Sequence, residues 1–138
     1  MLCGVHVDHA QGLAGHSDAD VAVHALMDAL LGAAGLGDIG ELFPDTDPAF
    51  GGVSSLGLLE RVVAWLSKAG WRVENADVTI VCERPRISGY RLEMRKRLAG
   101  ALEVGSDAVS VKATTTEGMG FEGRGEGIAA HAVCLLSR

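Results

Sequence analysis

Residues 16–48 read HSDADVAVHALMDALLGAAGLGDIGELFPDTDP. Asp20, His24 and Asp28 recur every four residues, so a helix of about 3.6 residues per turn would place them along one face. Almost every other residue of that helix is Val, Ala, Leu or Met, and a helix that is apolar on nearly all sides is normally buried. Burying an ionisable group costs on the order of several kcal/mol unless it is paired, hydrogen-bonded or bound to a metal. The polar stripe therefore predicts a partner.

Two explanations of the stripe remain open at this point: a core histidine held by two carboxylates, or a ligand or metal site. Asp38, Asp45 and Asp47 follow in a stretch rich in Gly, Pro and Asp, which we predict to be a loop over residues 35–52. Loops of that length in a compact domain are usually functional. Because these acidic residues come so close behind the stripe, we favour the site.

A second polar block, residues 112–129, reads KATTTEGMGFEGRGEGIA. Hydroxyls and exposed backbone amides are common phosphate donors, and Glu117 beside them suits a hard cation such as Mg²⁺ or Mn²⁺. Taken alone, the block also fits a glycine-rich hairpin that merely turns the chain. Arg124 and Glu126 likewise fit a solvated surface pair, and Lys112 fits either a phosphate contact or an ordinary outward strand lysine.

Composition limits the classes of protein. The chain has 138 residues, of which 48% are apolar, and this predicts one domain over residues 1–138. A net charge of −6 argues against a nucleic-acid partner. No apolar run is long enough to span a bilayer, so no membrane partner is expected. Three cysteines without CxxC spacing fit a reducing cytoplasm and argue against a disulfide framework.

Apolar periodicity predicts a single α+β domain whose mixed β-sheet has helices packed on one face. We expect a short strand over Leu2–Val7, a helix over Asp18–Ala34 capped by Ser17, and a helix over residues 55–69 that Ser54 or Ser55 caps and Gly70 ends. Further along we expect a strand over residues 76–82, a helix over 90–102, a strand over 109–114 and a last strand over Ile128–Leu136. That last strand is apolar throughout, so the second face of the sheet needs a cover, and self-association is the simplest one.

The two blocks resemble the signature blocks of the 2-C-methyl-D-erythritol 2,4-cyclodiphosphate synthase family, and the resemblance runs from about Leu2 to the end of the chain. It implies a homotrimer whose second sheet face forms the subunit interface, with active sites between subunits. It also implies a metal-dependent phosphorus–oxygen lyase of non-mevalonate isoprenoid biosynthesis. The substrate would be the cytidine diphosphate 4-diphosphocytidyl-2-C-methyl-D-erythritol 2-phosphate, which is converted to the cyclic diphosphate with release of CMP.

The resemblance also implies two metal sites. His24 would bind Zn²⁺ or another divalent cation, and Glu117 would bind Mg²⁺ or Mn²⁺. In the family an Asp-x-His pair on an N-terminal strand supplies the other two zinc ligands, and the printed sequence does not contain that pair. We therefore expect the domain to be N-terminally incomplete and its zinc binding impaired, with Asp8 and His9 remaining surface residues. The alternative is a catalytically impaired trimeric module that binds a nucleotide or an isoprenoid diphosphate.

Individual site residues follow from the same resemblance. His16 and Thr115 are expected to stabilise the transition state, Asp28 to be mainly structural, and residues 82–88 to hold cytosine mainly through backbone atoms. Phe121 and Arg124 would lie near a cavity on the trimer axis that can hold an isoprenoid diphosphate. The implied substrate-binding residues are His16, Ser17, Asp38, Ile39, Gly40, Phe43, Pro44, Asp45, Thr46, Asp47, Cys82, Pro85, Ile87, Ser88, Thr114, Thr115, Thr116, Glu117, Phe121 and Arg124.

Overall fold

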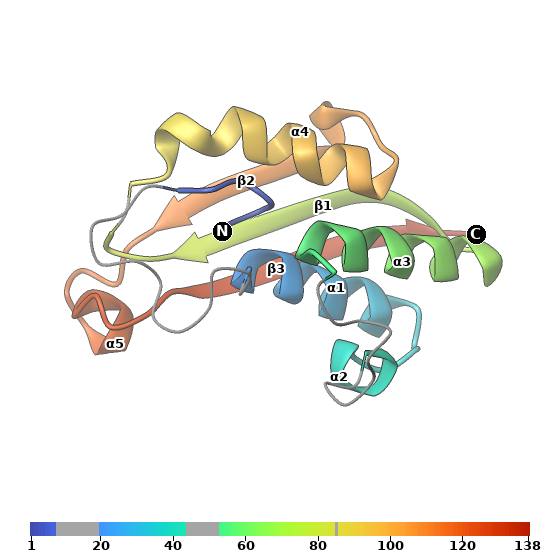
Figure 1. Ribbon diagram of the computed structural model, residues 1–138, viewed down its shortest axis with the longest axis horizontal. Helices are drawn as coiled ribbons and strands as arrows, with labels where there is room; N and C mark the ends of the chain where they lie inside the picture. The colour runs from blue at the N-terminus through green and yellow to red at the C-terminus, as the bar shows by residue number, and fades with distance from the viewer. Residues whose placement is uncertain (8–19, 44–52, 85) are drawn as a thin grey trace.

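The computed structural model describes residues 1–7, 20–43, 53–84 and 86–138. It shows a small α+β domain, as the sequence predicts (Figure 1). Its elements in chain order are α1 (Val21–Ala33), α2 (Ile39–Leu42), α3 (Ser55–Lys68), β1 (Arg72–Val81), the 3₁₀ turn η2 (Ser88–Tyr90), α4 (Arg91–Leu102), the 3₁₀ turn η3 (Ser106–Ala108), β2 (Val109–Thr114), α5 (Gly120–Gly123) and β3 (Ala129–Ser137).

The described strands form one mixed sheet in the order β2-β1-β3. β1 runs parallel to β2, with Val78 opposite Val111, and antiparallel to β3, with Val81 opposite Ala129. Because the carboxyl ends of β1 and β2 lie at the same edge, the segments that follow them come together there. β3 begins at that edge, so the glycine-rich segment before β3 also lies there.

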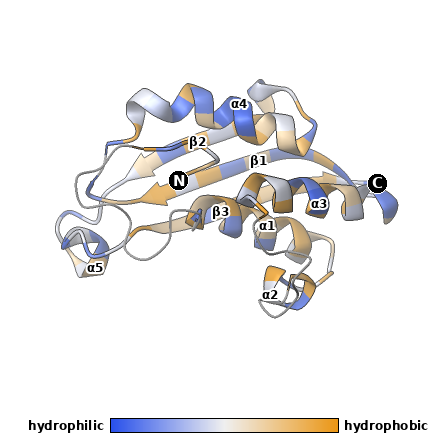
Figure 2. Ribbon diagram, viewed as in Figure 1, coloured by the Kyte–Doolittle hydropathy of each residue, from blue (hydrophilic) through white to orange (hydrophobic). Residues whose placement is uncertain are grey.

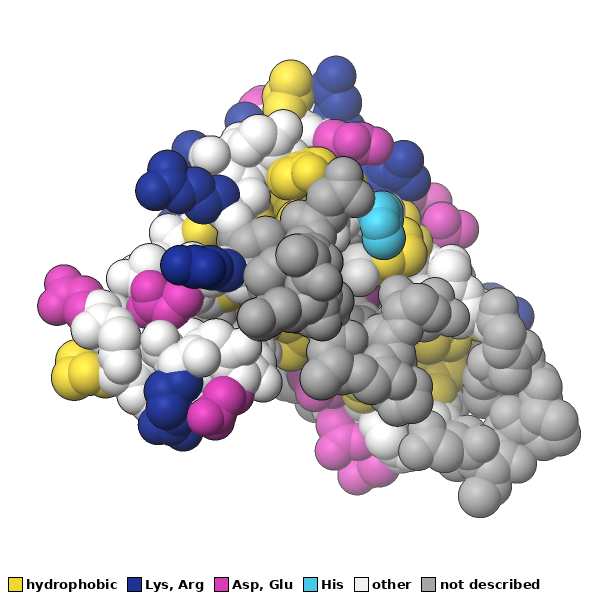
Figure 3. Space-filling model, turned by 60° about the vertical axis from the view of Figure 1, so that its left-hand side comes forward, with side chains coloured by type: hydrophobic (Ala, Val, Ile, Leu, Met, Phe, Trp, Pro, Cys, Tyr) yellow, Lys and Arg dark blue, Asp and Glu magenta, His cyan; other side chains and the backbone are white. Residues whose placement is uncertain are grey.

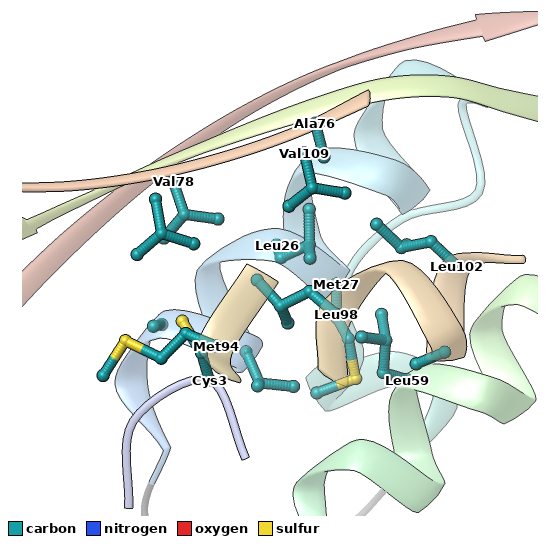
Figure 4. Packing of buried hydrophobic residues seen from close by; sticks show 14 of the residues in the cluster. Cys3, Leu26, Met27, Leu59, Ala76, Val78, Met94, Leu98, Leu102 and Val109 are labelled. Atoms are coloured by element: carbon teal, nitrogen blue, oxygen red, sulfur yellow. The ribbon is translucent and has the colours of Figure 1, made fainter. Parts of the chain in front are cut away.

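The three long helices cover one face of the sheet. α1 packs against β3, α4 packs against β2, and α3 contacts both helices. Figure 4 shows the apolar core between the strands and these helices, where Val78 and Val109 from the sheet lie above Leu26, Met27 and Leu98. Hydrophilic residues mark much of α4 in Figure 2, which fits a helix with one face in solvent. No described helix is long and apolar enough to cross a membrane.

The other face of the sheet has no helix over it among the described residues. Along β3 the side chains alternate, so Ala132 packs against the core whereas Val133 and Leu135 are 70% and 56% exposed. On the same face of the sheet, Nζ of Lys112 on β2 lies 2.7 Å from Oδ2 of Asp77 on β1. Lys112 is thus an outward strand lysine with a carboxylate partner.

The start of α1 differs from the sequence prediction. The helix begins at Val21 rather than Asp18, and its N-cap is Asp20, whose Oδ1 accepts a hydrogen bond from Val23 N at 3.1 Å. The proposed cap, Ser17, lies outside the described residues. Asp20 therefore precedes the helix instead of lying within its polar stripe. The first amides of a helix have no acceptor within the helix, and the Asp20 carboxylate accepts a hydrogen bond from one of them.

Two shorter predictions also need correction. Leu2–Val7 is no sheet strand: Leu2 and Val5 exchange backbone hydrogen bonds across a tight turn in which Cys3 and Gly4 have positive φ values of 51° and 75°. Short helices, α2 and α5, interrupt the two segments that the sequence predicts to be irregular. By contrast, Ser54 caps α3 through Gly57 N, and Gly70 follows its end at φ 86°, both as predicted.

Candidate active site

A hollow of about 340 Å³ opens where β1 and β2 end. Beyond the strands, Cys82 N still donates to the Thr114 carbonyl oxygen at 3.0 Å, and this bond keeps the two following segments side by side. The hollow thereby unites the segment predicted to hold cytosine with the segment predicted to hold phosphate. Its lining residues are Cys82, Glu83, Arg86, Ile87, Ser88, Ala113, Thr114 and Thr115.

Hydrogen bonds within the chain hold the backbone of the threonine-rich loop at the rim of the hollow, residues 114–118. Glu117 and Gly118 both adopt positive φ, 54° and 82°, a conformation that is uncommon for a glutamate. Glu117 N donates to Thr115 Oγ1 at 3.3 Å, and the Thr116 hydroxyl donates to the Met119 carbonyl oxygen. The Glu117 side chain itself is exposed. The loop thus presents a carboxylate and a threonine hydroxyl, an all-oxygen donor set that fits Mg²⁺ or Mn²⁺.

Electrostatics in the hollow disfavour ionisation of its cysteine. Burial raises the pKa of the Cys82 thiol, and the neighbouring Glu83 charge raises it further, so the thiol stays protonated at neutral pH. On the side of the molecule that carries the strand ends, charged side chains of both signs are interspersed (Figure 3). Phosphate would therefore be held by local contacts rather than by a broad basic surface.

A second group of predicted residues lies on α1 and α2. Asp38 caps α2 by accepting from Glu41 N at 3.0 Å, and Asp28 Oδ1 accepts from Ile39 N, also at 3.0 Å. Asp28 thus contacts the start of the segment Asp38–Gly40; its mainly structural role stays a prediction. Phe43 is 8% exposed, and its ring stacks on Trp65 with the two ring centroids 5.3 Å apart.

The zinc assignment rests on His24 alone within the described residues. His24 is half-buried on α1, one turn after Asp20. Asp20 cannot serve as a further ligand, because its two oxygens accept hydrogen bonds from Cys3 N, Gly4 N and Val23 N. Residues 1–7, 20–43, 53–84 and 86–138 contain no group of three His, Cys, Asp or Glu side chains placed to hold a metal. Among the described residues, His24 has no group of further ligands around it that would complete a three-ligand zinc site.

An exposed ion pair lies directly after α5. Arg124 binds Glu126 through two hydrogen bonds, Nε to Oε1 at 2.8 Å and Nη2 to Oε2 at 3.1 Å, which lower the pKa of the Glu126 carboxyl. Phe121 is 45% exposed. Arg124 thus has a carboxylate partner within the chain, as in the solvated-pair interpretation of the sequence.

Comparison with known proteins identifies the family. The model of the YgbB family matches residues 1–137. This chain belongs to the YgbB family. The YgbB chain is 57% identical over 138 residues to the 2-C-methyl-D-erythritol 2,4-cyclodiphosphate synthase of Methylococcus capsulatus, an alignment that covers 100% of this chain and 87% of that relative. The synthase of Symbiobacterium thermophilum is 59% identical, with 99% of this chain and 87% of the relative covered.

A solved structure gives the same result. The CDP-bound form of a 2C-methyl-D-erythritol-2,4-cyclodiphosphate synthase matches with a TM-score of 0.88 at 34% identity, and the match covers 99% of this chain and 89% of that chain. The family resemblance predicted from the two sequence blocks is confirmed.

Within this YgbB-family chain the predicted residues form separate groups. Cys82, Ile87, Ser88, Thr114 and Thr115 meet in the hollow, whereas the Asp38–Gly40 segment lies with α1 and does not line it. Figure 1 shows α2 far from the strand ends and from α5. Seven further predicted residues lie outside the described residues: His16, Ser17, Pro44, Asp45, Thr46, Asp47 and Pro85.

Sequence reasoning missed Glu83. Its Oε1 accepts hydrogen bonds from Thr116 N at 3.2 Å and Gly118 N at 3.1 Å. The only sequence signal was an acidic residue directly after a half-buried strand, and such a residue is usually a solvated strand end.

Proposed function

We propose that this YgbB-family chain acts as a 2-C-methyl-D-erythritol 2,4-cyclodiphosphate synthase. Its substrate would be 4-diphosphocytidyl-2-C-methyl-D-erythritol 2-phosphate, and its products the cyclic diphosphate and CMP. The observation that carries the proposal is the hollow at the strand ends, in which residues 82–88 adjoin Thr114 and Thr115. The names of the relatives and the CDP-bound neighbouring structure support the same substrate class.

The proposed reaction is an internal phosphoryl transfer. An oxygen of the 2-phosphate attacks the β-phosphorus of the diphosphate, the bond from that phosphorus to the CMP oxygen breaks, and CMP leaves with the electron pair. Both the nucleophile and the leaving group are phosphates of low pKa, so no general base is needed. The protein's contribution is alignment and charge neutralisation. The raised pKa of the Cys82 thiol fits this mechanism, because a neutral thiol adds no negative charge beside the phosphates.

Thr115 and the segment 82–88 would do the positioning. Because Thr115 Oγ1 already accepts from Glu117 N, its hydroxyl hydrogen remains available to donate to a phosphate oxygen. The backbone of residues 82–88 would hydrogen-bond the cytosine at the other end of the hollow. His16 would support the transferring phosphate, as the resemblance implies.

Metal ions would neutralise the phosphates. Enzymes of this family depend on metal, and we assign the Mg²⁺ or Mn²⁺ site to Glu117 and the Zn²⁺ site to His24. When bound, such cations act as Lewis acids that withdraw charge from the phosphate oxygens. Glu117 fits a hard cation through its exposed carboxylate, while His24 would supply one imidazole to a site that needs further ligands.

Homotrimerisation would unite the separate groups of residues. The open sheet face carries Val133 and Leu135, which are more than half exposed, and covering such side chains favours association. A neighbouring subunit could then bring its Asp38–Gly40 segment to the hollow of the first. Phe121 and Arg124 would lie close to the threefold axis, where an isoprenoid diphosphate could bind. The three cysteines form no disulfide with one another, which supports a cytoplasmic location.

Isothermal titration calorimetry with CMP, CDP, UDP and ADP tests the proposed ligand. CDP should bind more tightly than UDP or ADP, because the wrong base leaves buried polar groups unpaired at a cost of about 1 to 3 kcal/mol. Mg²⁺ should strengthen the binding of CDP but not that of CMP, because the cation site serves the β-phosphate. Equal affinities for all four nucleotides would refute a cytidine site.

A further inference from the structure

One oxygen of Glu83 joins the two halves of the hollow. Glu83 lies two residues beyond the end of β1, within the segment proposed to hold the base, and its side chain is half-buried. Its Oε1 accepts from Thr116 N at 3.2 Å and from Gly118 N at 3.1 Å, 33 and 35 residues further along the chain. These two amides stand on either side of Glu117, so the carboxylate of Glu83 fixes the backbone both before and after it.

The hydrogen bonds matter because the loop is in an unfavourable conformation. Glu117 has φ 54°, and a non-glycine residue stays in this region only when its surroundings hold it there. The third amide of the loop, Glu117 N, donates to Thr115 Oγ1. All three consecutive amides, at 116, 117 and 118, are therefore engaged within the protein. They are not the free phosphate donors that a glycine-rich sequence leads one to expect, and the loop instead offers the Glu117 carboxylate and the Thr115 hydroxyl.

We propose that Glu83 is a positioning residue that holds Glu117 in the orientation required to bind the divalent cation, and thereby links the base segment to the cation loop. The inference rests on the proposed function in that Glu117 is taken as a cation ligand. Glu83 is assigned a positioning role rather than a ligand's role because its Oε1 already accepts hydrogen bonds from two amides of the loop. Without Glu83 the nucleoside end of the hollow would remain, while the cation would lose its preformed ligand.

The test compares wild-type protein with Glu83→Ala and Glu83→Gln by calorimetry, using CMP and CDP with and without Mg²⁺. Glutamine keeps an acceptor oxygen for the two amides and alanine does not. Glu83→Ala should lose most of the Mg²⁺-dependent gain in CDP affinity, about tenfold or more, with CMP affinity unchanged. Glu83→Gln should keep most of the gain. Glu60→Ala, which removes an exposed charge from α3, should match the wild type.

The possible outcomes separate this inference from the proposed function. If the wild type gains affinity with Mg²⁺ and Glu83→Ala gains equally, the inference is wrong and the cation assignment stands. If the wild type shows no gain, the cation assignment to Glu117 is wrong, and the role of Glu83 falls with it. Equal loss of CMP and CDP binding in Glu83→Ala would assign Glu83 to the base site alone and overturn the inference.

Hydrogen exchange gives a second readout that needs no nucleotide. The amides of Thr116 and Gly118 should be protected in the wild type and in Glu83→Gln, and should exchange faster in Glu83→Ala. Unchanged protection of both amides in Glu83→Ala would show that the carboxylate does not hold the loop and would contradict the inference directly.

Discussion

Replacement of Asp20 by alanine is expected to destabilise the fold severely, although Asp20 lines no part of the strand-end hollow. The carboxylate is 1% exposed and accepts three backbone hydrogen bonds, from Cys3 N at 2.9 Å, Gly4 N at 2.7 Å and Val23 N at 3.1 Å. Loss of the helix cap to Val23 costs about 1 kcal/mol. The Cys3 and Gly4 amides, left buried without acceptors, add about 1 to 3 kcal/mol each. The free energy of unfolding should therefore fall by about 3 to 7 kcal/mol.

Urea denaturation followed by circular dichroism measures this loss, with both proteins at the same concentration because the proposed association of subunits would contribute to apparent stability. Asp20→Asn is the matched variant. Its amide oxygen can still accept from Cys3 N and Val23 N, but its NH₂ group then faces the Gly4 N–H, so an intermediate loss is expected. If Asp20→Ala loses less than about 1 kcal/mol, the three hydrogen bonds do not hold the N-terminal turn to α1, and the account of this junction is wrong.

Three further predictions concern the site and its assembly. Asp28→Ala should lower the free energy of unfolding, measured by urea denaturation, by only about 0.5 to 1.5 kcal/mol, because its hydrogen bond to Ile39 N is exposed. Calorimetry should show unchanged CMP affinity; loss of CMP binding would contradict the separation of the hollow from the Asp38–Gly40 segment. The pKa of the Cys82 thiol lies above its ordinary value of 9.0, so its contribution to stability is present below that pH and is lost as the pH rises through the raised pKa. Mass spectrometry after iodoacetamide treatment should find Cys82 barely alkylated at neutral pH, whereas rapid reaction would argue against the raised pKa. Val133→Asp should convert the proposed trimer to monomers, as measured by light scattering. Leu92→Asp, at a position 62% exposed on α4, should leave the trimer intact. A monomeric wild type at micromolar concentration would refute an interface on the open sheet face.

Much of the fold was predictable because local signals and packing agree. The central strand alternates apolar and polar residues, and the structure buries Ala76, Val78 and Ile80 as that alternation predicts. Ser54 and Gly70 mark the ends of α3, since a hydroxyl satisfies a free amide and glycine accepts a positive φ. The N-terminal turn was not predictable. Its apolar residues fit a strand, and the Asp20 carboxylate, distant in sequence, accepts hydrogen bonds from two amides of the turn.

The candidate site was predictable in composition but not in arrangement. The threonines and Glu117 were identifiable from their residue types and from the family resemblance. The role of Glu83 was not, because it depends on parallel pairing that places residue 83 beside residues 116 and 118. Arg124 shows a related limit. Its sequence fits a phosphate contact and a surface pair equally well, and only the two hydrogen bonds to Glu126, two residues later, show the pair within the chain.

The central claim is that a cytidine diphosphate binds in the hollow at the carboxyl ends of β1 and β2. Chemical-shift mapping by NMR during titration with CDP and Mg²⁺ tests it most directly. The account predicts that the largest amide shifts fall in two segments, residues 82–88 and 114–118, and that titration with CMP alone shifts mainly the first. Shifts confined to α5 or to the open sheet face, with both segments unaffected, would contradict the claim.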